Sequence, residues 1–203
     1  ATAFEWGRLK MQASVLGYFV HEKVERFEAR PDKAVATPAF FGSFKVLKNH
    51  DLSVRAFYKR MFRMPTFNDL YYTDMGNAFL KPEYAEQFNV GLKYARDFER
   101  SPFMRMLDVS VDAYYNKITD KIIAYPKGQQ FRWTMLNLGE VEIKGVDAVL
   151  NALFTLGKLE VTTKFQYTYQ KAIDITDPAD TYYRDQIPYI PWHSGSAILA
   201  LFY

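Results

Sequence analysis

The sequence predicts an all-β fold, and specifically an antiparallel transmembrane β-barrel. Aromatic residues are abundant, with 15 Tyr and 17 Phe among 203 residues, and membrane barrels use such side chains at their interfaces with water. Apolar and polar residues alternate along most of the chain, which indicates strands with one apolar face. Short and long connections also alternate, as in membrane barrels with short turns on one side and long loops on the other.

The composition excludes several other classes of protein. No stretch of ~18 apolar residues is present, so the sequence predicts no transmembrane helix. The chain has no Cys and a net charge of +3, which excludes disulfides and thiolate metal sites and offers no basic tract for nucleic acid. Residues 1–10 lack the basic start and apolar run of a signal peptide. We therefore expect either a mature chain or a fragment.

The clearest predicted strand runs from Lys158 to Gln170. Its apolar face carries Phe165, Tyr167 and Tyr169 towards one end, and its other face is polar throughout. A tilted strand needs ~9–11 residues to cross a bilayer, so this segment is long enough. Similar alternation predicts about eight strands in all, over residues 8–19, 37–47, 51–59, 87–94, 108–116, 145–154, 158–170 and 193–203.

The connections between these strands are of two kinds. Tight turns are expected at residues 48–50, 98–102 and 156–157, and long links at 22–36, 61–83, 121–141 and 171–191. The first strand then runs outward and the last runs inward, so all four long links fall on one side of the sheet. We expect that side to be extracellular, because membrane barrels have short periplasmic turns, and a ligand would arrive there.

A soluble antiparallel barrel or sandwich is the main structural alternative, since its strands alternate too. Three features favour the membrane barrel. The polar faces carry repeated charges, which suit a water-filled lumen. The apolar faces include small residues such as Gly17, Ala56 and Ala148, which pack poorly as a sole core. The predicted strands are also longer than the usual ~5–6 residues.

Two consecutive segments in the middle of the chain carry ordered motifs. The sequence reads Phe62-Arg63-Met64-Pro65-Thr66-Phe67-Asn68-Asp69-Leu70-Tyr71 and then Gly76-Asn77-Ala78-Phe79-Leu80-Lys81-Pro82-Glu83. These segments resemble the aromatic-Arg-x-Pro-x-Phe-x-(Asp/Glu)-Leu and Gly-Asn-x-x-Leu-Lys-Pro-Glu loops of TonB-dependent outer-membrane receptors. Residues 111–122, 137–140, 143–147 and 188–191 resemble the segments that follow in that family. The resemblance is closest to receptors of Bacteroidetes-like bacteria, near the cobalamin and haem subgroups.

The resemblance implies a barrel of the 22-strand type with an N-terminal plug domain inside it. Only about eight strands are predicted here, so we expect residues 1–203 to form a single barrel segment, with the plug and the final strands absent. We also expect other segments to complete the barrel, because unpaired backbone groups in lipid cost several kcal/mol each.

The resemblance further implies an active import receptor of the cell outer membrane, which is not an enzyme and uses no cofactor. Such a receptor binds a scarce ligand (cobalamin, haem or an iron chelate) at extracellular loops and passes it through the barrel. The implied partners are outer-membrane lipid, the small-molecule ligand, the TonB energy-transducing complex acting through the missing plug and, in some cases, a surface lipoprotein. Nucleic acid is not among them. The alternatives are a passive pore, a structural or adhesive barrel, and a soluble β-domain that binds carbohydrate or protein.

Candidate ligand contacts lie in the long links, where aromatic side chains and Arg would form a recognition surface. They are Arg63, Phe67, Asn68, Tyr71, Tyr72, Arg132, Trp133 and Tyr183. Interface girdles have the same composition, so both interpretations of the aromatic residues stay open. Arg63 also has a structural interpretation, in which it pairs with Asp69 or Glu83 and braces its loop.

The motifs of haem importers fit this sequence only in part. Those receptors carry an Asn-Pro-x-Leu motif, which reads Asn77-Ala78-Phe79-Leu80 here, and the His that they place between the two motifs is missing. This departure counts against haem as the ligand.

The sequence contains no catalytic constellation, and it predicts no metal site. His21, His50 and His193 lie far apart in different contexts, and we expect structural or solvated roles for them. The Asp residues at 174, 177 and 180 offer the oxygen ligands that Ca²⁺ prefers. Their spacing matches no EF-hand, so a solvated acidic loop is the favoured interpretation.

Overall fold

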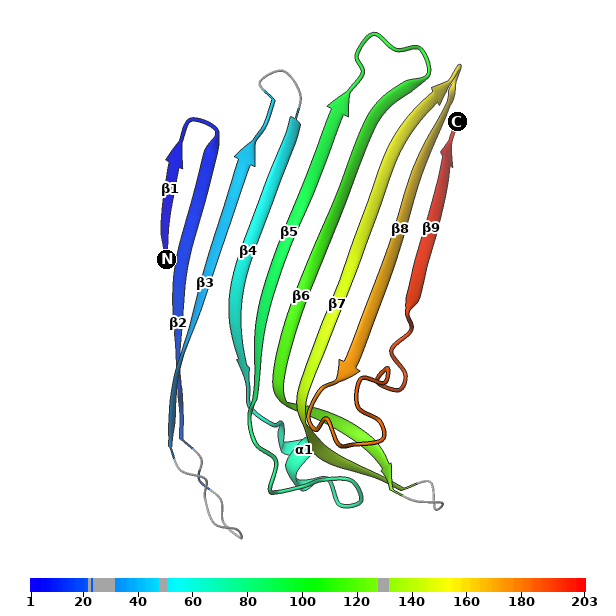
Figure 1. The fold of residues 1–203 in the computed structure, drawn as a ribbon. Coiled ribbons are helices and arrows are strands. Elements are labelled where there is room, and N and C mark those ends of the chain that lie inside the picture. The colour runs from blue at the N-terminus through cyan, green and yellow to red at the C-terminus, as the bar shows by residue number, and fades with distance from the viewer. Residues whose placement is uncertain (22, 24–31, 48–50, 128–131) are drawn as a thin grey trace.

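The structure, a computed structural model, describes residues 1–21, 23, 32–47, 51–127 and 132–203. In these residues nine antiparallel strands lie side by side in chain order and form one sheet (Figure 1). The strands are β1 (Thr2–Trp6), β2 (Leu9–Val20), β3 (Lys33–Lys45), β4 (Asp51–Arg63), β5 (Glu83–Asp97), β6 (Met104–Lys127), β7 (Arg132–Leu156), β8 (Leu159–Asp174) and β9 (His193–Phe202). The short helix α1 (Phe67–Tyr71) follows β4. No helix in the described ranges is long and apolar enough to span a bilayer.

The all-β prediction is confirmed, and each of the predicted strands is present. The additional strand β1 was not expected. It folds back onto β2 through a turn at Gly7, whose φ of +59° suits a residue without a Cβ. Five residues give too little alternation for a strand to be recognised from the sequence.

The expectation of a long loop over residues 121–141 is wrong. β6 continues to Lys127 and β7 begins at Arg132, and the two strands stay paired up to these two residues. β-Branched and aromatic residues such as Ile122, Ile123 and Trp133 favour this extension of the sheet. Figure 1 shows the resulting two-stranded arm reaching past the ends of the neighbouring strands.

The predicted asymmetry of the connections is visible in the sheet. Figure 1 shows the turns that join β1 to β2, β5 to β6 and β7 to β8 at one end, and α1 with the link after β8 at the other. The turn between β7 and β8 contains Gly157, which has a φ of +65°. We call the two ends of the sheet the turn end and the loop end.

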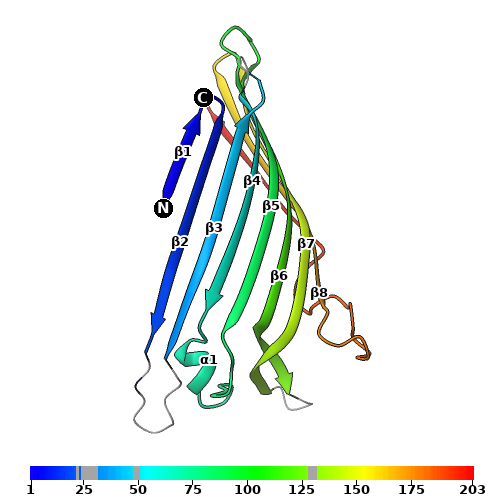
Figure 2. The ribbon, with the colours of Figure 1, turned by 60° about the vertical axis from the view of Figure 1, so that its left-hand side comes forward.

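One face of the sheet, the apolar face, has no protein layer over it. Cross-strand register brings Val54, Leu92 and Val111 into one row on this face, and Leu92 is 48% exposed. Phe165 and Leu199, on β8 and β9, are 50% and 64% exposed. Figure 2 shows the sheet from the side as a single curved layer. A soluble sandwich would cover such a face with a second sheet, whereas lipid covers it in a membrane barrel.

The opposite face, the polar face, carries ion pairs across its strands. Arg55 on β4 reaches over Gly91 on β5 and donates to both carboxylate oxygens of Asp112 on β6, at 3.2 and 2.5 Å. A Cβ at Gly91 would collide with the Asp112 carboxylate, so only glycine leaves room for this bridge. On the same face Lys93 pairs with Asp108 at 3.0 Å. The predicted charged face is therefore present.

Buried residues gather near the loop end, on positions that continue the polar face. They are Ala85, Ile118, Val141, Ile143, Ala172 and Ile187. Ala85, Ile118 and Val141 are direct neighbours on β5, β6 and β7. Ile187 comes from the link between β8 and β9, so this small core fixes that link against the sheet.

A charge on the apolar face should destabilise the sheet far more than the same charge on the polar face. We expect Val111→Arg to cost about 2–4 kcal/mol, because the side chain would enter hydrocarbon near the middle of the bilayer. Ser110→Arg, one residue away on the polar face, is the matched control and should cost much less. Urea unfolding of the complete gene product in lipid vesicles measures both, and equal costs would contradict the assignment of the faces.

Candidate functional site

The link between β4 and β5 begins with a capped turn of helix. The Thr66 side chain accepts a hydrogen bond from the Asp69 backbone N–H at 3.2 Å, and the Asp69 carboxylate accepts one from the Thr66 N–H at 2.9 Å. This reciprocal capping box satisfies two backbone donors that would otherwise lack partners at the start of α1. Leu70, only 4% exposed, anchors the other side of the turn.

Arg63 braces this link as one of its two interpretations predicted. Its guanidinium lies 3.1 Å from an Asp69 oxygen and 3.6 Å from a Glu83 oxygen, so it pairs with both carboxylates. Glu83 also accepts a hydrogen bond from the Ile122 backbone N–H at 3.0 Å. One group of charges thus joins the last residue of β4 to the start of α1, the first residue of β5 and the arm of β6.

Two asparagines fasten the rest of the link to the arm formed by β6 and β7. Asn137 accepts a hydrogen bond from the Lys81 N–H at 2.8 Å and donates to the carbonyls of Lys81 and Asp120, at 3.0 and 2.7 Å. Asn77 donates to the Met135 carbonyl at 3.0 Å. An Asn side chain offers two donors and one acceptor oxygen, and Asn137 uses all of them.

Gly76 allows the link to fold back on itself. A Cβ at this position would lie 2.6 Å from the Tyr72 nitrogen and 2.8 Å from the Leu70 carbonyl oxygen. Both contacts are with backbone, which cannot move aside without breaking the turn. The glycine of the Gly-Asn motif is therefore required by close packing of the chain.

The link between β8 and β9 is fastened to the edge of the sheet in a similar way. Gln186 accepts a hydrogen bond from the Ala172 N–H and donates to the Ile190 carbonyl, both at 3.0 Å. At the start of the link, Thr176 accepts from the Glu140 N–H at 2.9 Å and packs over Gly139. Both ends of this link are therefore held against β7 and β8.

The predicted ligand contacts fall into separate groups in the structure. Phe67, Asn68, Tyr71 and Tyr72 lie on α1 and at its end, where Phe67 is 80% and Tyr72 58% exposed. Arg132 and Trp133 start β7, and Trp133 contacts Tyr189 with ring centroids 6.1 Å apart. Tyr183 lies under the guanidinium of Arg184, 5.8 Å away. These groups share the loop end of the sheet.

Two exposed aromatic residues at the loop end were not among the candidates. Tyr189 is 84% and Phe79 93% exposed, and Tyr189 has a φ of +65°. Proline on both sides, at 188 and 191, marked this segment in the sequence, but only as the approach to a strand. The contact between Tyr189 and Trp133 depends on how the link folds, and no local pattern in the sequence predicts it.

Two of the histidines and the acidic loop make hydrogen bonds within the protein. His21 contacts Asp32 at 2.6 Å and His193 contacts the Tyr167 hydroxyl at 2.7 Å, while His50 lies outside the described residues. The Asp residues at 174, 177 and 180 accept backbone N–H groups two residues further along the chain, which is how Asp stabilises turns. In the described part of the chain, no group of three or more His, Asp or Glu residues is placed to hold a metal ion.

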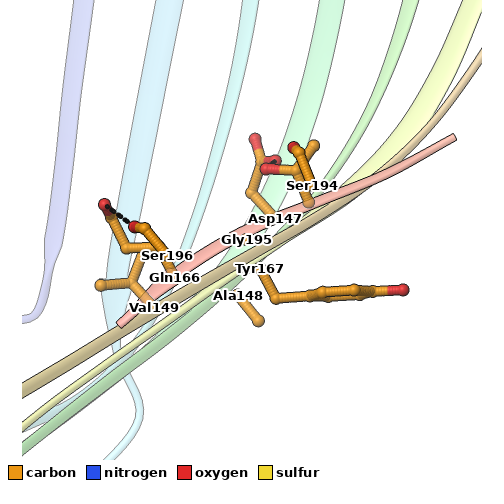
Figure 3. Close-up of a pocket in the computed structure, with 9 residues that line it drawn as sticks. Asp147, Ala148, Val149, Gln166, Tyr167, Ser194, Gly195 and Ser196 are labelled. Atoms are coloured by element: carbon orange, nitrogen blue, oxygen red, sulfur yellow. Dashed lines mark hydrogen bonds between the residues drawn. The ribbon is translucent and has the colours of Figure 1, made fainter. Parts of the chain in front are cut away.

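A polar trough lies across β7, β8 and β9. Figure 3 shows Asp147 and Ser194 pointing to one side of the sheet, with Tyr167 pointing to the other. Gln166 and Ser196 line the same trough and are joined by a hydrogen bond of 3.3 Å. The cavity measures about 490 Å³. Thr168 donates to the Asp147 carboxylate at 2.7 Å, so hydroxyl and carboxylate groups make the polar face hydrophilic here.

Residues 10–203 match the family described as "TonB dependent receptor-like, beta-barrel". The chain belongs to this family of TonB-dependent receptor β-barrels. It is therefore part of an outer-membrane protein, as the sequence predicted. Its ordered motifs at residues 62–83 form the braced link of the receptor's loop end.

Similar proteins agree with this assignment, and the matches span only a small part of their length. The chain is 34% identical over 99 residues to a vitamin B12 transporter, BtuB, of Vibrio vulnificus, which is 49% of this chain and 14% of that protein. It is also 34% identical over 113 residues to BtuB of Photobacterium profundum, which is 52% of this chain and 16% of that protein. Both relatives are named as transporters.

The solved structure of the copper transporter OprC has the same fold. It matches 80% of this chain and 26% of its own, with a TM-score of 0.51 and 17% sequence identity. The nine-stranded sheet is thus a portion of a larger barrel, and the free edges of β1 and β9 need other strands beside them in a bilayer.

Removing the Asn137 side chain should loosen the loop end without disturbing the sheet. Asn137→Ala deletes three hydrogen bonds to two segments. We therefore expect the free energy of unfolding to fall by roughly 1–3 kcal/mol and proteolysis within residues 64–82 to be faster. Asn68→Ala, within the link itself but exposed, is the control. Limited proteolysis of the folded receptor compares them, and equal cleavage rates would argue against the bracing role.

Proposed function

We propose that this chain is the barrel segment of an active import receptor, which binds a scarce ligand at its loop end and passes it along the polar face. The observation that carries the proposal is the match to the TonB-dependent receptor family over residues 10–203. The braced links support it, because a recognition surface that is already ordered loses less conformational entropy on binding.

Cobalamin is the ligand that we propose first. Two relatives named as vitamin B12 transporters are 34% identical over about half of this chain. Haem and iron chelates are the runners-up. The absence of the Pro and His of the haem importers' motifs, around Asn77 to Leu80, speaks against haem.

The ligand contacts that we propose are the exposed and partly exposed candidates at the loop end. Phe67, Asn68 and Tyr72 project from or next to the capped helix α1, whose position is fixed by Arg63 and Leu70. The proposed set also includes Tyr71 at the end of α1, Arg132, Trp133 and Tyr183. Arg63 acts mainly as a brace in this proposal, because both of its ion pairs are internal to the link.

The energy for import would come from the TonB complex acting on a plug domain inside the completed barrel. Binding at the loop end needs no energy input, whereas release into the periplasm would. A surface lipoprotein that covers the loop end is a further partner compatible with the same arrangement.

Uptake should depend on the energy-transducing partner, and binding should not. Cells that make the complete receptor but lack TonB are expected to bind labelled cobalamin at their surface and fail to accumulate it. Accumulation that continues without TonB would support a passive pore instead. Binding of an iron chelate but not of cobalamin would keep the import mechanism and change the ligand.

Loss of the exposed aromatic side chains on α1 should weaken ligand binding. We expect the double variant Phe67→Ala/Tyr72→Ala to lower the affinity about tenfold or more, since exposed aromatic anchors dominate recognition energy. Leu156→Ala, half exposed at the turn end, is the control and should leave affinity unchanged. Equilibrium binding to the purified receptor measures the affinity of each variant. An unchanged affinity in the double variant would show that α1 is not part of the binding site.

A further inference from the structure

The apolar face changes character abruptly at one row of residues near the loop end. The cross-strand register places Phe40, Tyr58, Phe88, Tyr115, Lys144 and Lys171 in this row, one from each of the strands β3 to β8. The rows towards the turn end are apolar, as in Val54, Leu92 and Val111. The next row towards the loop end is charged and contains Arg60, Glu86, Lys117 and Glu142. The aromatic row therefore marks the edge of the hydrocarbon layer.

The cations at this boundary lie over aromatic rings. Lys144 lies 5.4 Å from the ring centroid of Tyr115, and Lys171 lies 5.7 Å from that of Trp192. Arg60 and Lys33 both lie 5.6 Å from the ring centroid of Tyr84. A ring face attracts a cation by its quadrupole, and it leaves N–H groups of the cation available to another ligand. Lys33 alternates onto the opposite face of β3, so we restrict the name cation–ring band to Arg60, Lys144 and Lys171 with the rings of Tyr84, Tyr115 and Trp192.

Carboxylates neutralise the band only in part. Glu142 pairs with Lys144 at 2.7 Å, and Glu140 pairs with the neighbouring Lys117 at 2.8 Å. Arg60 and Lys171 form no ion pair with a carboxylate in the described ranges of the chain. Positive charge is therefore left over at the depth where lipid headgroups begin.

We propose that the cation–ring band binds the phosphate groups of anionic lipids in the leaflet that surrounds the loop end. Three observations define this occupant. The band lies on the face turned towards lipid, it borders the apolar rows directly, and its surplus charge is positive. A juxtamembrane Lys or Arg attracts anionic lipid with about 1 kcal/mol, or roughly fivefold in affinity, for each charge. The inference is independent of which ligand the receptor imports.

The test compares lipid binding by the complete receptor in nanodiscs of phosphatidylcholine mixed with phosphatidylglycerol. Native mass spectrometry of the extracted receptor gives the preference for phosphatidylglycerol. We expect Arg60→Gln/Lys171→Gln to lower that preference about fivefold for each charge removed. The charge-conserving variant Arg60→Lys/Lys171→Arg should retain it.

Lys59→Gln/Lys164→Gln is the matched control. These lysines lie on the polar face, opposite Gln87 and Asn151 respectively, and their loss changes the net charge by the same amount. The control should keep the preference, and heat-modifiable gel mobility should show that every variant is folded. An equal loss in both double variants would reduce the effect to net charge, and no loss in the first would leave the band as an ordinary aromatic girdle. Either result overturns the proposal.

Discussion

Every backbone N–H and C=O that crosses a bilayer must find its partner within the protein, because hydrocarbon offers none. The antiparallel ladder from β1 to β9 meets this requirement between its strands and leaves only the outer edges of β1 and β9 to be paired. It also determines which face of the sheet each side chain occupies, since a ladder places alternate side chains on opposite faces. One face can then be apolar against lipid while the other holds ion pairs such as Arg55–Asp112.

The links at the loop end have no backbone ladder of their own. Hydrogen bonds from side chains hold them in place instead. Asn137 and Asn77 donate to backbone carbonyls of neighbouring segments, Gln186 joins its link to the edge of β8, and Gly76 permits a close return of the chain. These contacts hold the links in place and allow Phe67 and Tyr189 to remain exposed, which suits a surface that recognises a ligand.

The two proposals concern opposite sides of one sheet. Ligand recognition uses the rim of the loop end and the polar face, whereas lipid recognition uses the cation–ring band on the apolar face. Tyr115 and Lys144 belong to β6 and β7, the same strands whose extension carries Met135 and Asn137. In these proposals, the strands whose arm anchors the links with the proposed ligand contacts also carry residues that face the lipid headgroups.

The sequence alone predicted eight of the nine strands and their two faces, because these follow from a period of two that is local to each strand. The alternation of short and long connections predicted the end of the sheet at which the links lie. The sequence also predicted the pairing of Arg63, whose partners Asp69 and Glu83 lie close to it along the chain. It did not predict the arm at residues 121–141, since polar residues interrupt its alternation and pairing between β6 and β7 decides its length. The contact of Trp133 with Tyr189, and the cations over Tyr84 and Tyr115, were decided only by the tertiary structure. Register between strands sets these contacts, and spacing along one strand carries no information about its neighbour.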